Sequence, residues 1–183
     1  MRTTTLGMLC ALMCVLAACA EVTPVTNFNL QRIAGKWYLV GFATNALWFV
    51  NQKAGMKVGT AVLVPTDEGN LDLSIANLNA DGTCWRMKYI ANKTDTPGQF
   101  IFHSQMWNTD NEMRIADVLY NNYALVHIIS TKNGISELLS KLYSRTQETS
   151  VALQQRFTQF SLDTGILPEN IVILPKNAEC PKH

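Results

Sequence analysis

Short segments in which apolar and polar residues alternate are the feature that most constrains the fold of this chain. Leu71, Leu73 and Ile75 are separated by single polar residues, and a period of two places alternate side chains on one face of a β-strand. Turn-forming pairs such as Asn133-Gly134 stand between the segments, as expected for hairpins. The pattern predicts eight strands, within residues 37–44, 57–64, 71–75, 85–89, 100–102, 113–115, 123–130 and 138–145.

Eight strands are enough for an antiparallel sheet to close on itself and enclose one small ligand. An open two-sheet sandwich is the structural alternative, but the lack of long crossover connections favours an up-and-down barrel. A helix-like stretch, residues 149–164, follows the strands, with Leu153, Phe157 and Phe160 on one face and Gly165 at its end. We therefore expect an all-β, eight-stranded antiparallel up-and-down barrel with one C-terminal helix packed outside.

The first 20 residues are predicted to be a secretory signal peptide. They contain one early positive charge, Arg2, then an apolar stretch, and they end in small residues at Ala20. The stretch is too short to span a membrane. A bacterial lipoprotein signal with Cys19 as the lipidated residue is the alternative, but a secreted chain fits the later cysteines better. Residues 21–183 would then form one domain.

Cleavage after Ala20 would leave two of the five cysteines, Cys84 and Cys180. In an oxidising compartment two cysteines most simply form one bridge, here between the C-terminal tail and the body of the domain. Two unpaired buried thiols are the alternative. The Asn92-Lys93-Thr94 sequon makes Asn92 a candidate glycosylation site.

Composition argues against several functional classes. The chain carries 15 Lys+Arg and 14 Asp+Glu, without the basic excess of a nucleic-acid-binding protein. The content of 48% hydrophobic and 16% charged residues excludes a disordered chain. His103, His127 and His183 lack metal-ligand spacing, and no phosphate-binding loop is visible. We expect no metal, no cofactor and no stable membrane anchor.

Two motifs resemble those of the lipocalin family. Gly35 and Trp37 match the Gly-x-Trp signature that opens the lipocalin barrel, and Arg145 matches the arginine that packs over that tryptophan. The resemblance covers nearly all of residues 21–183. A third family motif, usually Thr-Asp-Tyr, retains only Tyr120 here, which leaves the contacts of that turn open.

Within the family, residues 142–147 and 171–175 resemble lipocalin-type prostaglandin D synthase, and residues 27–29, 93–96 and 141–143 resemble alpha-1-microglobulin. The synthase depends on a cavity thiol. Alignment puts Gly59 at that position and Leu39, Ala61 and Ile75 at the supporting hydroxyl positions. The reactive cysteine of alpha-1-microglobulin falls on Ala46. The resemblance therefore implies a binding protein, with a prostaglandin D synthase-type isomerase as the disfavoured alternative.

Strand alternation predicts which side chains line the barrel. Lys141 alternates with Tyr143 in the last strand, so it should face the interior, where a ligand carboxylate would supply the partner that a buried ammonium needs. The alternative is that Lys141 extends to solvent. Trp48 and Lys53 resemble residues that admit ligand at the open end. The remaining predicted ligand-binding residues are Leu39, Ile75, Met87, Tyr89, Phe102, Met113 and Tyr143.

Together these features predict a secreted, monomeric carrier of one small hydrophobic molecule, such as a fatty acid, a retinoid or a prostanoid-like compound. A structural or protein-binding role stays open, because no feature of the sequence marks an interaction surface.

Overall fold

The structure is a computed structural model that describes residues 21–181. The predicted signal peptide, with Cys10, Cys14 and Cys19, lies outside the described residues, as does His183. Nine strands are present: β1 Gly35–Thr44, β2 Gly59–Pro65, β3 Leu71–Leu78, β4 Cys84–Lys93, β5 Gln99–Ser104, β6 Thr109–Leu119, β7 Tyr123–Lys132, β8 Ile135–Ser144 and β9 Ile171–Ile173. Two α-helices, α1 Leu47–Gln52 and α2 Val151–Asp163, are accompanied by two short 3-10 helices, η1 Lys53–Gly55 and η2 Pro168–Asn170.

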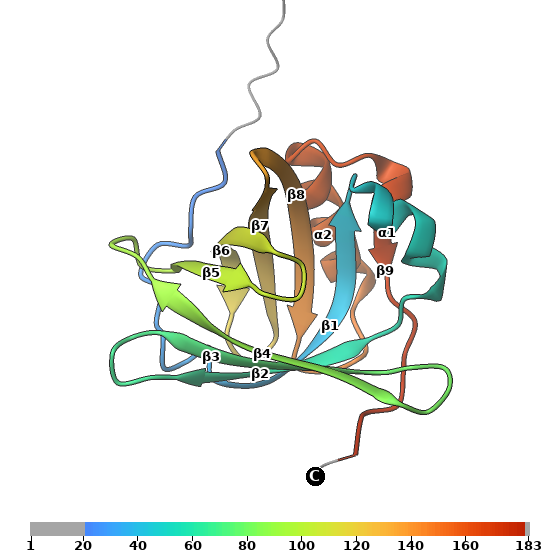
Figure 1. The fold of residues 1–183 in the computed structure, drawn as a ribbon, viewed down its shortest axis with the longest axis horizontal. Helices are drawn as coiled ribbons and strands as arrows, with labels where there is room; N and C mark the ends of the chain where they lie inside the picture. The colour runs from blue at the N-terminus through green and yellow to red at the C-terminus, as the bar shows by residue number, and fades with distance from the viewer. Residues whose placement is uncertain (1–20, 182–183) are drawn as a thin grey trace, which may run out of the picture.

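The first eight strands close into an antiparallel barrel (Figure 1). Each strand from β2 to β8 pairs with the next, and β1 pairs with both β2 and β8. The short β9 adds to β1 beyond the point where β2 separates from it, with Ile173 opposite Gly41. This closure confirms the predicted barrel rather than a sandwich.

The β7–β8 hairpin shows how local sequence fixes the strand pairing. Asn133 and Gly134 both have positive φ, at 50° and 79°, the conformation of a type I′ turn, whose twist matches that of the strands. The pairing continues without a register shift from Lys132–Ile135 to Tyr123–Ser144. As a result, alternate side chains of β8 face the barrel interior and the outer helix.

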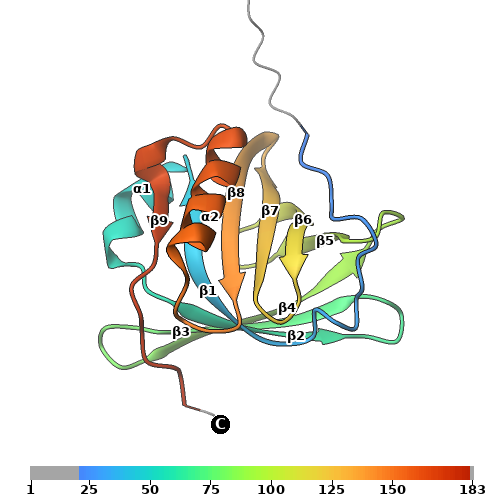
Figure 2. The same cartoon turned by 180° about the vertical axis from the view of Figure 1, so that it is seen from behind.

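Helix α2 packs on the outside of the barrel across β1 and β8 (Figure 2). It begins where the side chain of Ser150 accepts a hydrogen bond from Leu153 N at 3.2 Å. Phe157 is fully buried beneath it. A Cβ added at Gly41 would lie 2.7 Å from Phe157 Cε1, so glycine permits the close approach of β1 and α2. The predicted C-terminal helix is therefore confirmed, within two residues at each end.

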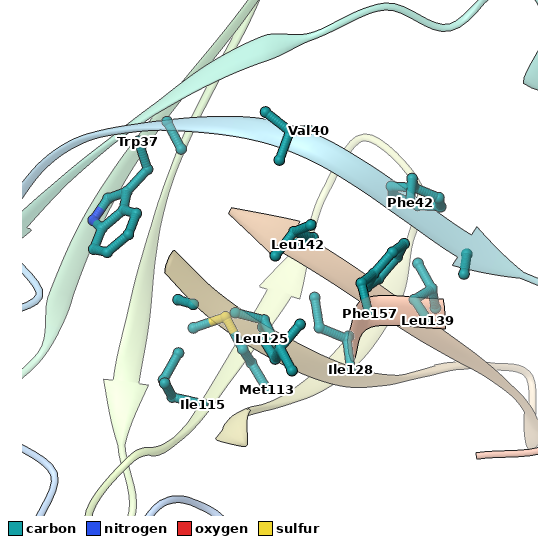
Figure 3. Close-up of a cluster of buried hydrophobic side chains, with 14 of the residues drawn as sticks. Trp37, Val40, Phe42, Met113, Ile115, Leu125, Ile128, Leu139, Leu142 and Phe157 are labelled. Atoms are coloured by element: carbon teal, nitrogen blue, oxygen red, sulfur yellow. The ribbon is translucent and has the colours of Figure 1, made fainter. Parts of the chain in front are cut away.

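The core has two parts, one inside the barrel and one between the barrel and α2. Figure 3 shows buried side chains from β1, β6, β7, β8 and α2 that contribute to them. In β8, Leu139 lies opposite Ile128 on the inner face, while Leu142 lies beside Gly41 under the helix. The C-terminal tail is fixed by the predicted disulfide, which the structure confirms between Cys84 and Cys180.

One end of the barrel is closed by Trp37 and Arg145. The guanidinium carbon of Arg145 lies 3.6 Å from the centre of the Trp37 ring. Its Nε donates to Tyr120 O at 2.9 Å and its Nη1 to Lys36 O at 2.8 Å. Tyr120 also accepts a hydrogen bond from Asn29 N through its hydroxyl, at 2.7 Å. The one tyrosine retained from the third family motif thus holds the N-terminal segment against the closed end.

Candidate functional site

The inner face of the barrel brings the predicted ligand-binding side chains together. Leu39 on β1 lies opposite Tyr143 on β8, and Ile75 on β3 lies opposite Met87 on β4. These four side chains are partly buried. Closed pairing around the barrel therefore surrounds an interior lined mainly by apolar side chains, which is typical of small-molecule sites.

Two tyrosines add polar atoms to this apolar lining. The rings of Tyr89 and Phe102 stack with centroids 4.3 Å apart, and Met113 is buried on β6. Desolvation by burial raises the pKa of Tyr89 and Tyr143 well above the usual tyrosine range, and Tyr143 adds to the shift of Tyr89. Both phenols therefore stay neutral and can donate a hydrogen bond to a ligand.

Lys141 is the cation on this inner face. It lies opposite Phe42 on one side and Val126 on the other, and its Nζ is 5.5 Å from the centre of the Phe42 ring. Burial lowers the pKa of Lys141 from 10.5 to about 8. Within residues 21–181 no carboxylate forms an ion pair with it.

Phe42 is an interior residue that strand alternation missed. Alternation from Trp37 and Leu39 predicts an outward side chain at position 42. A register shift between Leu39 and Gly41 inserts one residue into β1, and such a bulge moves every later side chain to the opposite face. The one sequence signal for this bulge is Gly41, since an isolated glycine within a strand pattern is common at bulges.

The four positions that align with the synthase's catalytic groups are neighbours in the structure. Leu39 lies opposite Gly59, and Ala61 lies opposite Ile75. A Cβ at Gly59 would lie 2.9 Å from Asn77 Nδ2 and 3.1 Å from Ala76 O. The side-chain amide of Asn77 donates a hydrogen bond to Lys57 O at 3.1 Å. It therefore lies too close to position 59 for the Cβ of a cysteine there.

Trp48 and Lys53 lie where the chain leaves β1. Trp48 is 44% exposed, and its Nε1 donates to Glu137 Oε2 at 3.2 Å. The ammonium of Lys53 donates to the carbonyl of Glu169 and, at 3.0 Å, to Asn170 Oδ1. Trp48 is accessible to a ligand, whereas the amine of Lys53 links η1 to η2.

A separate pocket of about 310 Å³ lies between the end of β1, the start of β8 and the end of α2. It is lined by residues 44–47, 136–138 and 164–166. None of the predicted ligand-binding residues lines it.

His127 faces away from the interior, beneath α2. It lies opposite Ser140 on β8 and Arg114 on β6, and its ring meets that of Phe160 edge-on at 6.5 Å. Burial, together with the charge of Arg114, lowers its pKa from 6.5 to about 4. Its Nδ1 has no hydrogen-bond partner in the described part of the chain, so the histidine is neutral at physiological pH.

Residues 21–181 contain no group of three or more His, Cys, Asp and Glu side chains that could hold a metal ion. No helix among them is long and apolar enough to cross a membrane. Asn92 is exposed on β4, on the opposite face from buried Ala91, so its side chain is accessible to modification.

Comparison with known proteins gives the family. The lipocalin / cytosolic fatty-acid binding protein family matches residues 34–178. A lipocalin of Rhinella marina is 33% identical, over 93% of this chain and 93% of that protein, and the prostaglandin-H2 D-isomerase of Bos taurus is 30% identical, over 96% and 91%. The solved structure of the siderocalin Ex-FABP, which functions through dual ligand specificities, aligns with a TM-score of 0.71 at 26% identity, covering 82% of this chain and 99% of that one. The chain therefore belongs to the lipocalin family, whose members bind small hydrophobic ligands.

Proposed function

We propose that this protein is a carrier that binds one small hydrophobic molecule inside the barrel. The observation that carries the proposal is the set of partly buried apolar side chains on the inner face, including Leu39, Ile75 and Met87. Burial of apolar ligand surface against them contributes roughly 25 cal/mol per Å². Fatty acids, retinoids and prostanoid-like molecules are apolar over most of their surface, and Lys141 would pair with an acidic head group.

The proposed site of action is extracellular. Lipocalins are generally secreted, the first 20 residues have the layout of a signal peptide, and a disulfide is typical of oxidising compartments. Trp48 would lie along the route of the ligand, and the protein would act as a monomer.

Native mass spectrometry of the protein from its natural source tests the proposal. The expected spectrum shows the mature chain with one small hydrophobic molecule bound per chain. Unfolding should release the molecule, and its mass should then be readable separately. A chain that carries no small molecule and takes up none of a panel of fatty acids would contradict the proposal.

A prostaglandin-H2 D-isomerase activity is the second candidate, because several similar proteins carry that name. Gly59 and the apolar Leu39, Ala61 and Ile75 argue against it, since the chemistry needs an activated thiol. We expect no turnover of prostaglandin H2. In a Gly59→Cys variant, Asn77 would obstruct the thiol, so Gly59→Cys/Asn77→Ala is the informative gain-of-function control. Turnover by the unmodified chain would favour the enzyme.

A further inference from the structure

Lys141 is a buried cation of the inner face without a counter-ion among the described residues. Its side chain points into the barrel between Phe42 and Val126, which are both buried. Its ammonium lies over the face of the Phe42 ring, 5.5 Å from the ring centre. Within the described part of the chain its ammonium has neither a carboxylate partner nor a hydrogen bond.

An amine in such surroundings is a nucleophile rather than only a positive charge. Without a counter-ion, burial favours the uncharged form, which agrees with a pKa of about 8. At neutral pH the uncharged amine, with its free electron pair, is therefore more populated at Lys141 than at an exposed lysine. Desolvated lysines of this kind form Schiff bases with carbonyl compounds.

We propose that Lys141 captures lipophilic aldehydes by forming an imine inside the barrel. This inference rests on the proposed function, because the aldehyde must enter the same interior. The alkyl chain would lie against Leu39, Ile75 and Met87. Tyr143 is two residues further along β8 and faces the same interior. Its phenol can donate a hydrogen bond to the carbonyl oxygen of the aldehyde.

The reaction balances without any oxidant or reductant. The electron pair of Nζ attacks the carbonyl carbon while the C=O π pair moves to the oxygen. A proton moves from nitrogen to oxygen to give a carbinolamine. The carbon–oxygen bond then breaks, and both amine hydrogens and the carbonyl oxygen leave as one water molecule. The product is a C=N bond between Lys141 and the former aldehyde carbon.

Borohydride trapping with decanal tests the inference. The protein is incubated with decanal, reduced with sodium cyanoborohydride and digested for peptide mass spectrometry. We expect one decyl group on the peptide that contains Lys141, formed at least tenfold faster than on any exposed lysine. Lys141→Arg, which keeps the charge but is not nucleophilic, and Lys141→Met should lose this adduct. Lys88→Met, on the outer face of β4, should retain it.

Decanoic acid separates failure of this inference from failure of the proposed function. Saturable binding of decanoic acid, together with decanal adducts spread evenly over surface lysines, would overturn the imine and leave the carrier intact. Equal decyl labelling of wild type and of folded Lys141→Arg would also overturn the imine at Lys141. If decanoic acid, decanal and every member of the fatty-acid panel fail to bind in the interior, the carrier function itself is wrong.

Discussion

At the closed end of the barrel, Arg145 joins three segments that are distant in sequence. It stacks on Trp37 and donates to the carbonyls of Tyr120 and Lys36. Replacing it with alanine removes the stacking on the buried Trp37 ring and the hydrogen bonds to these carbonyls, of which the one to Tyr120 O is partly buried. We expect Arg145→Ala to lower the free energy of unfolding by about 3 kcal/mol in urea titrations.

Arg156 provides the matched control for that substitution. Like Arg145, it lies over an aromatic ring, that of Tyr123, but it is on the exposed surface of α2 and forms an ion pair with Asp117. Exposed ion pairs contribute about 1 kcal/mol or less, so Arg156→Ala should change stability by less than that. Equal losses for the two variants would contradict a special role for the Arg145–Trp37 contact.

His127 should make stability depend on pH. Its pKa is lowered in the folded state to about 4, so the unfolded chain takes up the proton first as pH falls below about 6.5. The stability contributed by the neutral imidazole is complete above pH 6.5 and is lost toward pH 4, by about 3 kcal/mol in all. Urea titrations across this window should show wild type losing that much more than His127→Leu. If the unfolding free energies of wild type and His127→Leu change in parallel with pH, the lowered pKa of His127 is contradicted.

The interior residues divide into those that alternation can predict and those that it cannot. Leu39, Ile75 and Tyr143 follow strict alternation and lie on the inner face. Phe42 does not, because a bulge lies between Leu39 and Gly41; Gly41 makes a bulge plausible, but the shift in register is defined only by the pairing with β8. The obstruction of Gly59 by Asn77 is likewise a contact between strands, which only the folded register reveals.

At the scale of elements, the docking of α2 depends on the absence of a side chain at Gly41. A methyl group there would lie 2.7 Å from Phe157 Cε1 and 3.0 Å from Leu142 Cβ. We expect Gly41→Ala to lower the unfolding free energy by about 1–3 kcal/mol, because overpacking displaces the helix. At Gly55 an added Cβ meets nothing within 4 Å, so Gly55→Ala should stay within about 0.5 kcal/mol of wild type.

The Cys84–Cys180 bridge fixes the C-terminal tail to β4 across 96 residues of sequence. In the chain-entropy model a cross-link of this span stabilises the fold by about 4 kcal/mol. The Cys84→Ser/Cys180→Ser variant should lose roughly that amount in thermal and urea unfolding. The tail keeps contacts of its own, such as Asn177 Nδ2 to Leu78 O at 3.0 Å. A loss of unfolding free energy below about 1 kcal/mol would mean that these contacts hold the tail in place without the disulfide.

The long elements were predictable from sequence, and the short ones were not. All eight barrel strands and α2 contain a predicted segment, although residues 100–102 and 113–115 mark only parts of β5 and β6. Helix α1 spans six residues and β9 three, too few to show a period. β9 forms because its backbone pairs with β1, a long-range contact that local propensity does not report.

At the scale of the whole molecule, barrel closure accounts for how an apolar interior and a polar exterior coexist on the same strands. Side chains of each strand point alternately inward and outward. The inner face can therefore bind a ligand while the outer face contacts solvent or α2. Ile75 on β3 and Val64 on β2 show the two sides: Ile75 packs against the core, and Val64 is 52% exposed.

Calorimetric titration with decanoic acid, comparing Ile75→Trp with Val64→Trp, tests the central claim most directly. An indole at Ile75 fills the interior, whereas the same indole at Val64 lies on the outer surface. The carrier function predicts saturable one-to-one binding by wild type and Val64→Trp, with at least a tenfold weaker affinity for Ile75→Trp. Equal affinities for all three proteins, or no saturable binding by wild type, would contradict a ligand site inside the barrel.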